Sequence, residues 1–434
     1  MKKQQDLHPS EIARILRELN DDEFELYIKK IPKEIIGDVT LELPDRYFGD
    51  IIDRVGINDL STAITELESD DQTDFMQEFE EHDSQKAKTV FKLLDKNDQQ
   101  DILNLKKYSD QEAGAYMQRE IFTAKEHENT DRVIKRFARL KKSNQLENVQ
   151  YLFIIRNDGY LSFGINLEDL LIFDFQKSII ENINIEQDED FRPIIAYDNQ
   201  NIDEVVDIFQ EFDLGVMPIV NRDNILVGRI TADDIYDIID EQATEQMFNM
   251  VGVDDEAEED ESIFEAGKKR AIWLSINLIT AIIASLVISM FTNTLETIVA
   301  LAILMPIVAS MGGNAGTQTL TVVVRQMALG DITQSDAIRT IKKEVILSLA
   351  NGLLFALIMG IIASIWFNQG LLGVVIAISM IINLLSAGFF GAAIPLLLKK
   401  LNIDPAIGST VILTTITDVV GFLSFLGLST IILL

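Results

Sequence analysis

The chain has 434 residues, of which 69 are acidic and 37 are basic, giving a net charge of −32. Six acids and six bases follow Arg270, so the whole net charge lies in residues 1–270 and the remainder is neutral. This acidity disfavours nucleic acid as a partner and favours cations, and the absence of cysteine excludes disulfides and thiol chemistry.

Residues 1–117 are predicted to form an acidic, all-α N-terminal domain. From about residue 7 onward, apolar residues recur three or four positions apart, as a helix that buries one face requires. Asp and Asn residues stand before several of these apolar runs, where they suit helix N-caps. The segment carries no catalytic motif of its own.

Residues 118–243 change to alternating strand and helix signals. A strand, a polar turn, a second strand and a short helix follow one another over residues 149–171, and the same order returns over 215–239. The second unit resembles a CBS domain in Met217–Val220 and Leu226–Ile235, and the first is a more degenerate copy. Tandem CBS domains bind adenosine nucleotides such as ATP or serve a purely structural role, and both alternatives stay open here.

Residues 244–270 are predicted to form a connecting helix with an acidic run at 254–261. Such a run is usually a solvated linker, but this one directly precedes an apolar region. Residues 271–434 then contain five apolar stretches, each close to the roughly 20 residues that a spanning helix needs. They cover about 271–291, 298–325, 345–367, 371–398 and 406–434.

The basic residues predict the orientation of these spans. Lys and Arg lie before the first stretch, between the second and third, and after the fourth, whereas the other two connections carry none. By the positive-inside rule, these three connections face the cytosol. No apolar signal segment follows Met1–Gln5. We therefore expect a multi-pass protein of the cell inner (plasma) membrane, with a cytoplasmic N-terminus and the C-terminus outside.

Asp418 lies within the last apolar stretch. A carboxylate is costly there and normally faces a bundle interior or a water-filled path. On an ideal helix Thr410, Thr414 and Gly421 share its face, and Thr417 borders it. Hydroxyl and carboxylate groups on one face suit a hydrated cation. The alternative is a structural aspartate satisfied by threonine hydroxyls, but its depth in the membrane favours a functional role.

The second unusual stretch is Pro306–Thr319, which begins with a proline and contains Gly312, Gly313, Asn314 and Gly316. Proline frees a helical carbonyl, and irregular backbone that lines a cavity can coordinate an ion. Helix packing is an equally strong alternative, because two of the glycines form a GxxxG motif. Spacing alone leaves both interpretations open.

The combination of these segments resembles the MgtE family of magnesium channels and transporters. The most specific marks are Glu112–Gly114 with Met117, Gly312–Gly316, Asn402–Ala406 and Thr417–Val419. The resemblance covers nearly the whole chain. It implies a multidomain membrane protein with an all-α N-terminal domain, α/β tandem CBS domains, a connecting plug helix and a five-helix transmembrane domain.

The resemblance also implies a function. The protein would be a homodimer in the lipid bilayer, with an axial pore lined by the second and fifth spans. Asp418 would hold hydrated Mg²⁺, an ion that dehydrates reluctantly. The other implied pore-lining residues are Gly312, Gly313, Asn314, Gly316, Thr410, Thr414, Thr417 and Gly421. Cytosolic Mg²⁺ would close the pore by binding acidic interfaces, with Asp234, Asp237 and Glu245 as regulatory metal ligands.

The sequence departs from the family pattern at three places. Gln242 and Gln246 stand where further sensing acids are expected, and Thr317 replaces an asparagine. These departures leave the number of regulatory sites and the detail of the filter open.

Other functions explain the sequence less well. A coupled secondary transporter or exporter of divalent cations is the main alternative, but such carriers favour broken helices in repeated halves, and five spans show no such symmetry. A membrane enzyme finds little support, because the histidines at positions 8, 82 and 127 are scattered in the soluble part. A membrane-anchored nucleotide sensor leaves Asp418 unexplained. We therefore expect a Mg²⁺-selective channel or transporter for uptake, with no catalytic residues.

Overall fold

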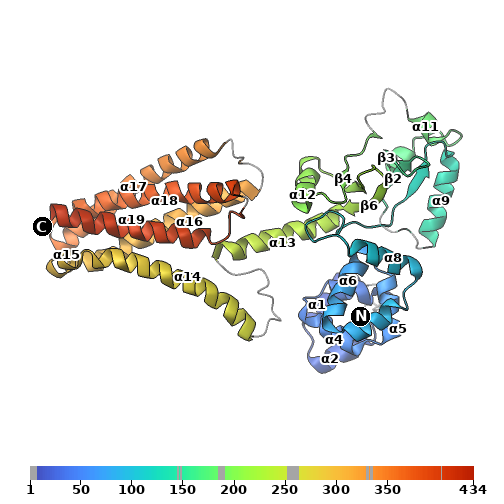
Figure 1. Cartoon of the computed structure of the whole chain (residues 1–434), viewed down its shortest axis with the longest axis horizontal. Helices are drawn as coiled ribbons and strands as arrows, with labels where there is room; N and C mark the ends of the chain where they lie inside the picture. The colour runs from blue at the N-terminus through green and yellow to red at the C-terminus, as the bar shows by residue number, and fades with distance from the viewer. Residues whose placement is uncertain are drawn as a thin grey trace. The chain divides into compact units, whose positions relative to one another are not determined.

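The computed structural model describes residues 7–434 except for a few short segments, and it divides into two compact units, Met1–Asp240 and Glu241–Leu434, which are treated separately below (Figure 1). The segments outside the description are 144–145, 147–148, 184–190, 252–262, 329–331, 333–335 and 402. The acidic run at 254–261 and Asn402 therefore lie outside the described residues.

The N-terminal part of the first unit is all-α, which confirms the prediction. Its helices are α1 (Pro9–Arg17), α2 (Asp21–Ile28), η2 (Lys33–Ile35), α3 (Ile36–Leu41), α4 (Arg46–Arg54), α5 (Ile57–Thr65), α6 (Ser69–His82), α7 (Ser84–Phe91) and α8 (Lys96–Leu105). Side chains of His8, Asn20, Asp83 and Asp95 cap helix N-termini, and Asn and Asp are among the residues preferred at such positions. A single apolar core forms around Phe48, with Phe75 packed 4.9 Å away, centroid to centroid.

Two small sheets follow in the same unit, as the repeated strand signals predicted. Their elements are β1 (Thr123–Lys125), α9 (Thr130–Lys142), β2 (Tyr151–Ile155), β3 (Leu161–Asn166), α10 (Leu167–Leu170), α11 (Ile179–Asn182), β4 (Ala196–Tyr197), α12 (Ile202–Glu211), β5 (Val216–Val220), β6 (Leu226–Thr231) and α13 (Ala232–Val251). Each sheet pairs its middle strand antiparallel with the next strand and parallel with an earlier one. The antiparallel hairpins were predicted, whereas the short parallel strands β1 and β4 were not.

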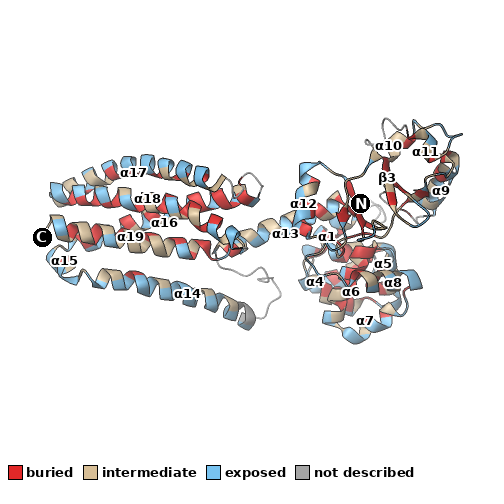
Figure 2. Cartoon of the chain, turned by 45° about the horizontal axis from the view of Figure 1, so that its top comes forward, coloured by how far each residue is buried: buried red, intermediate tan, exposed pale blue. Residues whose placement is uncertain are grey.

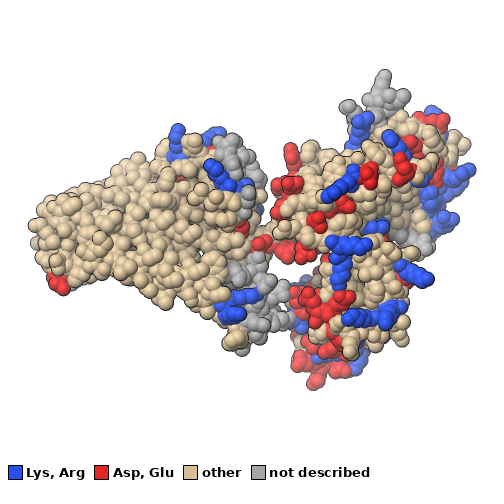
Figure 3. Space-filling model, in the orientation of Figure 1, with Lys and Arg blue, Asp and Glu red and all other residues tan. Residues whose placement is uncertain are grey.

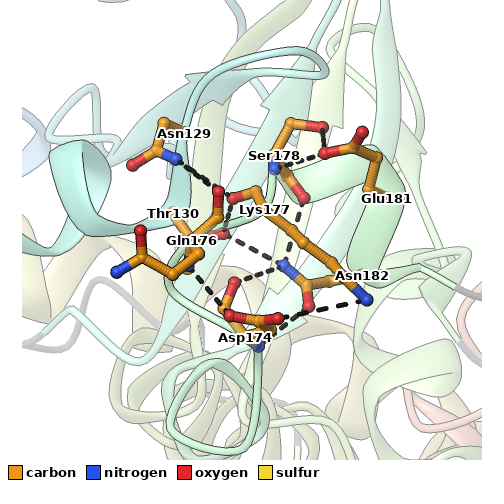
Figure 4. A network of polar contacts seen from close by, with 8 residues as sticks. All are labelled: Asn129, Thr130, Asp174, Gln176, Lys177, Ser178, Glu181 and Asn182. Carbon is orange, nitrogen blue, oxygen red and sulfur yellow. Dashed lines mark hydrogen bonds and ion pairs between the residues drawn. The ribbon is translucent and has the colours of Figure 1, made fainter.

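A polar network holds the first CBS-like half together (Figure 4). The Asn182 side-chain amide donates to Thr130 Oγ1, at the start of α9, and to the Asp174 carbonyl, at 3.2 and 3.0 Å. Thr130 Oγ1 itself donates to the Lys177 carbonyl at 2.9 Å. The loop around Asp174 is thus tied to α9 through backbone carbonyls, which is a structural role for these polar side chains.

Helix α13 corrects the expected boundary of the connecting helix. The prediction began a separate helix at residue 244, but α13 runs without a break from Ala232 to Val251. The reason is local, because no glycine or proline interrupts this segment. The next described helix, α14, begins at Ile263.

The second unit is a helical bundle. It contains α14 (Ile263–Ser289), α15 (Thr292–Thr297), α16 (Ala300–Ala328), α17 (Ala337–Phe367), α18 (Gly370–Lys400) and α19 (Ser409–Ile432). Within the described residues, five helices are long and apolar enough to cross a membrane, which confirms the predicted number. Helix α18 packs against α16, α17 and α19 and is the most buried of the five (Figure 2).

Charge is distributed unevenly between the two units (Figure 3). Acidic and basic side chains are spread over the visible face of the first unit, whereas the length of the bundle is almost free of them. Its basic residues gather where spans begin or end, as at Lys342 in the first turns of α17 and Lys399 in the last turn of α18. A helix bundle whose long sides carry almost no charge suits the hydrocarbon core of a membrane.

Candidate functional site

Asp418 lies in the middle of α19 and is partly buried. Thr414 and Thr410, one and two turns earlier, are partly accessible on the same helix. Across the described residues, the Asp418 carboxylate has neither a hydrogen bond nor an ion pair. A carboxylate without such partners in a spanning helix retains its full capacity to bind a cation or its water shell.

The threonines near Asp418 do not satisfy it. Thr414 Oγ1 donates to the Thr410 carbonyl at 2.9 Å, and Thr417 Oγ1 donates to the Thr414 carbonyl at 3.0 Å. Their hydroxyl hydrogens are therefore engaged by their own helix, while the oxygen lone pairs stay available. The interpretation of Asp418 as a structural residue held by threonine hydroxyls finds no support in these contacts.

The glycine-rich stretch of α16 is regular helix, contrary to one of the two interpretations from sequence. The helix continues from Ala300 to Ala328 with Pro306 inside it. Most carbonyls of this stretch therefore stay engaged in helical hydrogen bonds, and no run of irregular backbone faces a cavity there. The packing interpretation of the glycines is the one that the geometry supports.

Gly312 and Gly316 are buried against neighbouring helices. A Cβ added to Gly312 would lie 2.3 Å from Asn383 Nδ2 on α18, and one added to Gly316 would lie 3.0 Å from Leu413 Cδ2 on α19. Gly421 and Thr417 are buried as well. These four predicted pore-lining residues are thus buried within the chain's own helices, and at the three glycines the close approach of a neighbouring side chain requires a small residue.

An accessible polar face remains on the two helices. Gly313, Thr410 and Thr414 are partly accessible, and Asn314 is exposed. The exposed residues of α16 also recur at helical spacing, and the polar ones are Ser310, Asn314, Gln318, Thr321 and Arg325. Sequence reasoning named only part of this stripe, although its spacing of three or four residues was a readable signal.

A second candidate site lies in the first unit, where α13 begins. Asp234 accepts hydrogen bonds from Thr231 Oγ1 at 2.7 Å and from Gln118 Nε2 at 3.2 Å. Burial raises the pKa of Asp234 to about 6, against the opposing effect of the Thr231 hydrogen bonds. This residue was predicted as a metal ligand, and the structure places it in an acidic, poorly solvated environment.

Acids of the N-terminal domain approach Asp234 from the start of α6. Burial, and then nearby negative charges that include Asp234, raise the pKa of Asp71 to about 7 and that of Glu68 to about 7. The same causes raise the pKa of Asp70 well above its ordinary value, and its Oδ1 is buried without a partner among the described residues. Sequence reasoning missed these three residues, because they are distant from Asp234 along the chain.

One buried cation partly compensates this cluster. Arg229 on β6 lies 3.8 Å from the Glu68 carboxylate and donates from Nε to Gln118 Oε1 at 3.2 Å. Its positive charge lowers the pKa of Glu68, but burial has the larger, opposite effect. Within the described residues, no group of three or more acidic, His or Cys side chains is arranged as a ready metal site.

Of the other two predicted regulatory ligands, Asp237 lies near Asp234, whereas Glu245 lies elsewhere. Asp237 lies one turn further along α13, and burial, then the charge of Glu42, raises its pKa. Glu245 lies eleven residues beyond Asp234, which is about three helical turns. In the second unit, Asn249 Nδ2 donates to Glu245 Oε1 at 3.4 Å and to Asp404 Oδ2 at 3.2 Å. Glu245 therefore belongs to the contact between the end of α13 and the turn before α19.

Three family models match separate stretches of the chain. The model of a divalent cation transporter, MgtE, matches residues 305–428. The model of the MgtE intracellular N domain matches residues 7–111, and that of the CBS domain matches 189–241. The CBS match covers the second copy of the strand-turn-strand-helix repeat, which is the copy that resembles the family more closely in sequence.

Relatives match along almost their whole length. The magnesium transporter MgtE of Bacillus subtilis is 28% identical over 428 residues, which cover 98% of this chain and 92% of that protein. The magnesium transporter MgtE of Thermus thermophilus is 28% identical over 437 residues, with 99% and 94% covered. Among solved structures, the cytosolic domain of the Mg²⁺ channel MgtE in complex with ATP has a TM-score of 0.49 and 23% identity, covering 54% of this chain and 92% of that one.

Proposed function

Because the chain belongs to the MgtE family of magnesium transporters, we propose that it forms a Mg²⁺-selective pathway for magnesium uptake that cytosolic Mg²⁺ closes. The observation that carries this proposal is Asp418, a carboxylate without a partner among the described residues in the middle of a spanning helix. Mg²⁺ keeps several of its waters when bound. A carboxylate and threonine oxygens on one face can hold such a hydrated ion through its water shell.

The accessible polar face supports a homodimer. Asn314 and Gln318 lie on the exposed side of α16, and polar groups that face lipid are costly. In a dimer with a two-fold axis, the polar stripe on α16 of each copy would pack against the same stripe of the other copy and so be shielded from lipid. The axis would then be lined by α16 and α19 of both protomers, and two Asp418 carboxylates would face one ion.

The acidic cluster supports regulation by the transported ion. Glu68, Asp71 and Asp234 disfavour their charged forms in the compact first unit, because burial and mutual repulsion act together. A divalent cation that bridges two such carboxylates would stabilise the compact state by its differential affinity. Helix α13 begins at Ala232, beside this cluster, and runs to Val251, and Asn249 in its last turn bonds to Asp404 in the turn before α19.

Flux and single-channel measurements test the proposal. In liposomes the protein should carry Mg²⁺, and Asp418→Asn should abolish uptake, whereas Glu296→Gln, the same change at an exposed acid in α15, should not. Steady unitary currents with Mg²⁺ as the sole permeant cation would establish a channel. Strict coupling to a second ion would instead favour a secondary transporter, and wild-type uptake in Asp418→Asn would overturn the proposed pathway. ATP binding stays a prediction, which titration of the purified protein tests.

A further inference from the structure

Asn383 is a buried polar residue that the proposed pathway does not use. It lies in the middle of α18 and is 1% exposed. Its Nδ2 donates to the Val308 carbonyl on α16 at 2.8 Å, while its Oδ1 is buried without a partner among the described residues. Burying a half-satisfied amide costs free energy relative to an apolar side chain of similar size. Its presence therefore needs a reason other than stability.

Two glycines on different helices make room for this amide. A Cβ added to Gly312 of α16 would lie 2.3 Å from Asn383 Nδ2, and one added to Gly421 of α19 would lie 2.8 Å from the same atom. Both distances are below any normal contact between a Cβ and a nitrogen. The Asn383 amide therefore occupies space between α16 and α19 that exists only because both residues are glycine.

This junction lies at the level of the pathway residues. Gly421 follows Asp418 by three residues, less than one turn of α19. Gly312 precedes the exposed Asn314 by two residues on α16. The contact of Asn383 with both glycines thus fixes how the polar face of α16 is rotated and shifted along the helix axis relative to that of α19. It does so within about one turn of Asp418.

We propose that Asn383 is a positioning residue of the ion pathway. Its amide holds α16 and α19 at a fixed separation and register, and through this sets the geometry in which Asp418 meets a hydrated cation. Asn383 itself does not touch the ion. The effect of Asn383 on ion transport rests on the proposed function, but the packing of α16, α18 and α19 around its amide can be tested without transport.

The first test measures transport by the full-length protein in liposomes over a range of Mg²⁺ concentrations. Asn383→Ala should raise the concentration for half-maximal uptake by about tenfold, in the range found when a residue that orients a metal ligand is removed. Its preference for Mg²⁺ over Ca²⁺ should also change. A lower maximal rate with unchanged half-saturation and unchanged selectivity would reduce Asn383 to a packing residue and overturn the proposal.

The second test measures thermal unfolding in detergent, which needs no transport. Gly312→Ala and Gly421→Ala should each lower the melting temperature, because the added methyl group meets the Asn383 amide. Gly427→Ala is the matched control on α19, because its added Cβ would meet only Phe291 Cζ at 3.9 Å. Adding Asn383→Ala to Gly312→Ala should raise the melting temperature again, a coupling that independent sites do not show.

The two tests separate the possible failures. If the wild-type protein carries no Mg²⁺, the proposed function fails, while rescue of Gly312→Ala by Asn383→Ala would still establish the junction. If Asp418→Asn abolishes uptake but Asn383→Ala keeps the half-saturation and selectivity of the wild type, the function stands and the positioning role falls. The absence of any rescue would overturn the junction itself.

Discussion

The side-chain amide of Asn249 donates to Asp404 Oδ2 over 3.2 Å and so joins the end of α13 to the turn that precedes α19. The Asn249 carbonyl adds a second link by accepting from the Gly408 amide at 3.3 Å. Gly408 has φ of 60°, a conformation that glycine adopts at no steric cost, and it directly precedes the first residue of α19. The N-terminus of α19, the helix that carries Asp418, is thus held by hydrogen bonds to the last turn of α13.

Removing the Asn249 side chain should weaken closure by cytosolic Mg²⁺. Asn249→Ala loses the bonds to Asp404 and Glu245, so the end of α13 is held less firmly and more Mg²⁺ is needed to inhibit uptake. Mg²⁺ inhibition curves in liposomes check this, with Thr244→Ala as a control at an exposed position of the same helix. An inhibition curve identical to that of the wild type would show that this contact does not contribute to closure.

The compact state of the first unit should depend on pH when Mg²⁺ is absent. The pKa values of Glu68 and Asp71 rise to about 7 from ordinary values of 4.5 and 3.8, and that of Asp234 rises to about 6. A raised pKa means that protonation stabilises this arrangement. The stabilisation is complete below about pH 4 and is lost as the pH rises through 6 to 7.

Energy transfer between two dyes can measure this pH dependence. The chain has no cysteine, so Ser84→Cys on the N-terminal domain and Ser143→Cys beside α9 would be the only labelled positions. Transfer should be higher at pH 6 than at pH 8 without Mg²⁺, and Mg²⁺ should restore it at pH 8. Equal transfer at both values would contradict the role of the buried carboxyls.

Neutralising the acids of the N-terminal domain should imitate bound Mg²⁺. Glu68→Gln with Asp71→Asn removes repulsion against Asp234 and keeps side-chain shape, so the compact state should form without divalent cations. In the dye experiment the response to Mg²⁺ should become flatter. The control pair is Asp45→Asn with Glu81→Gln, at two exposed acids of the same domain. A double variant that still requires the wild-type Mg²⁺ concentration would remove this cluster from the sensor.

A designed disulfide should join α16 to α19. A Cβ at Gly313 would lie 3.8 Å from Thr414 Cγ2, so side chains at these two positions touch, as the two cysteines of a disulfide must. After mild oxidation, the double variant Gly313→Cys with Thr414→Cys should no longer react with a maleimide. It should still run as a single chain on a non-reducing gel, because the disulfide forms within one chain. Gly313→Cys with Thr430→Cys is the control, because Thr430 lies four turns further along α19 and contacts Thr294. Free thiols in both pairs would contradict the packing of these two helices.

Local pattern was enough to predict most elements of the fold. The apolar stretches gave five spanning helices, the repeated strand signals gave both hairpins, and helical spacing gave the N-terminal domain. Asp418 could be singled out as well, because the cost of a carboxylate in an apolar stretch is visible without knowledge of its neighbours. The short strands β1 and β4 were missed, since two or three residues carry too little pattern.

Only the tertiary structure decided which side chains meet across elements. Helical spacing grouped Gly421 with Asp418, and the family resemblance added Gly312, whereas packing placed both glycines against Asn383, a residue that no local pattern singled out. Likewise Glu68 and Asp71 acquire their raised pKa values from burial beside an aspartate more than 160 residues later in the chain. Periodicity determines which face of a helix is apolar, but the partner of each polar group depends on how distant elements pack, and that is set by the whole chain.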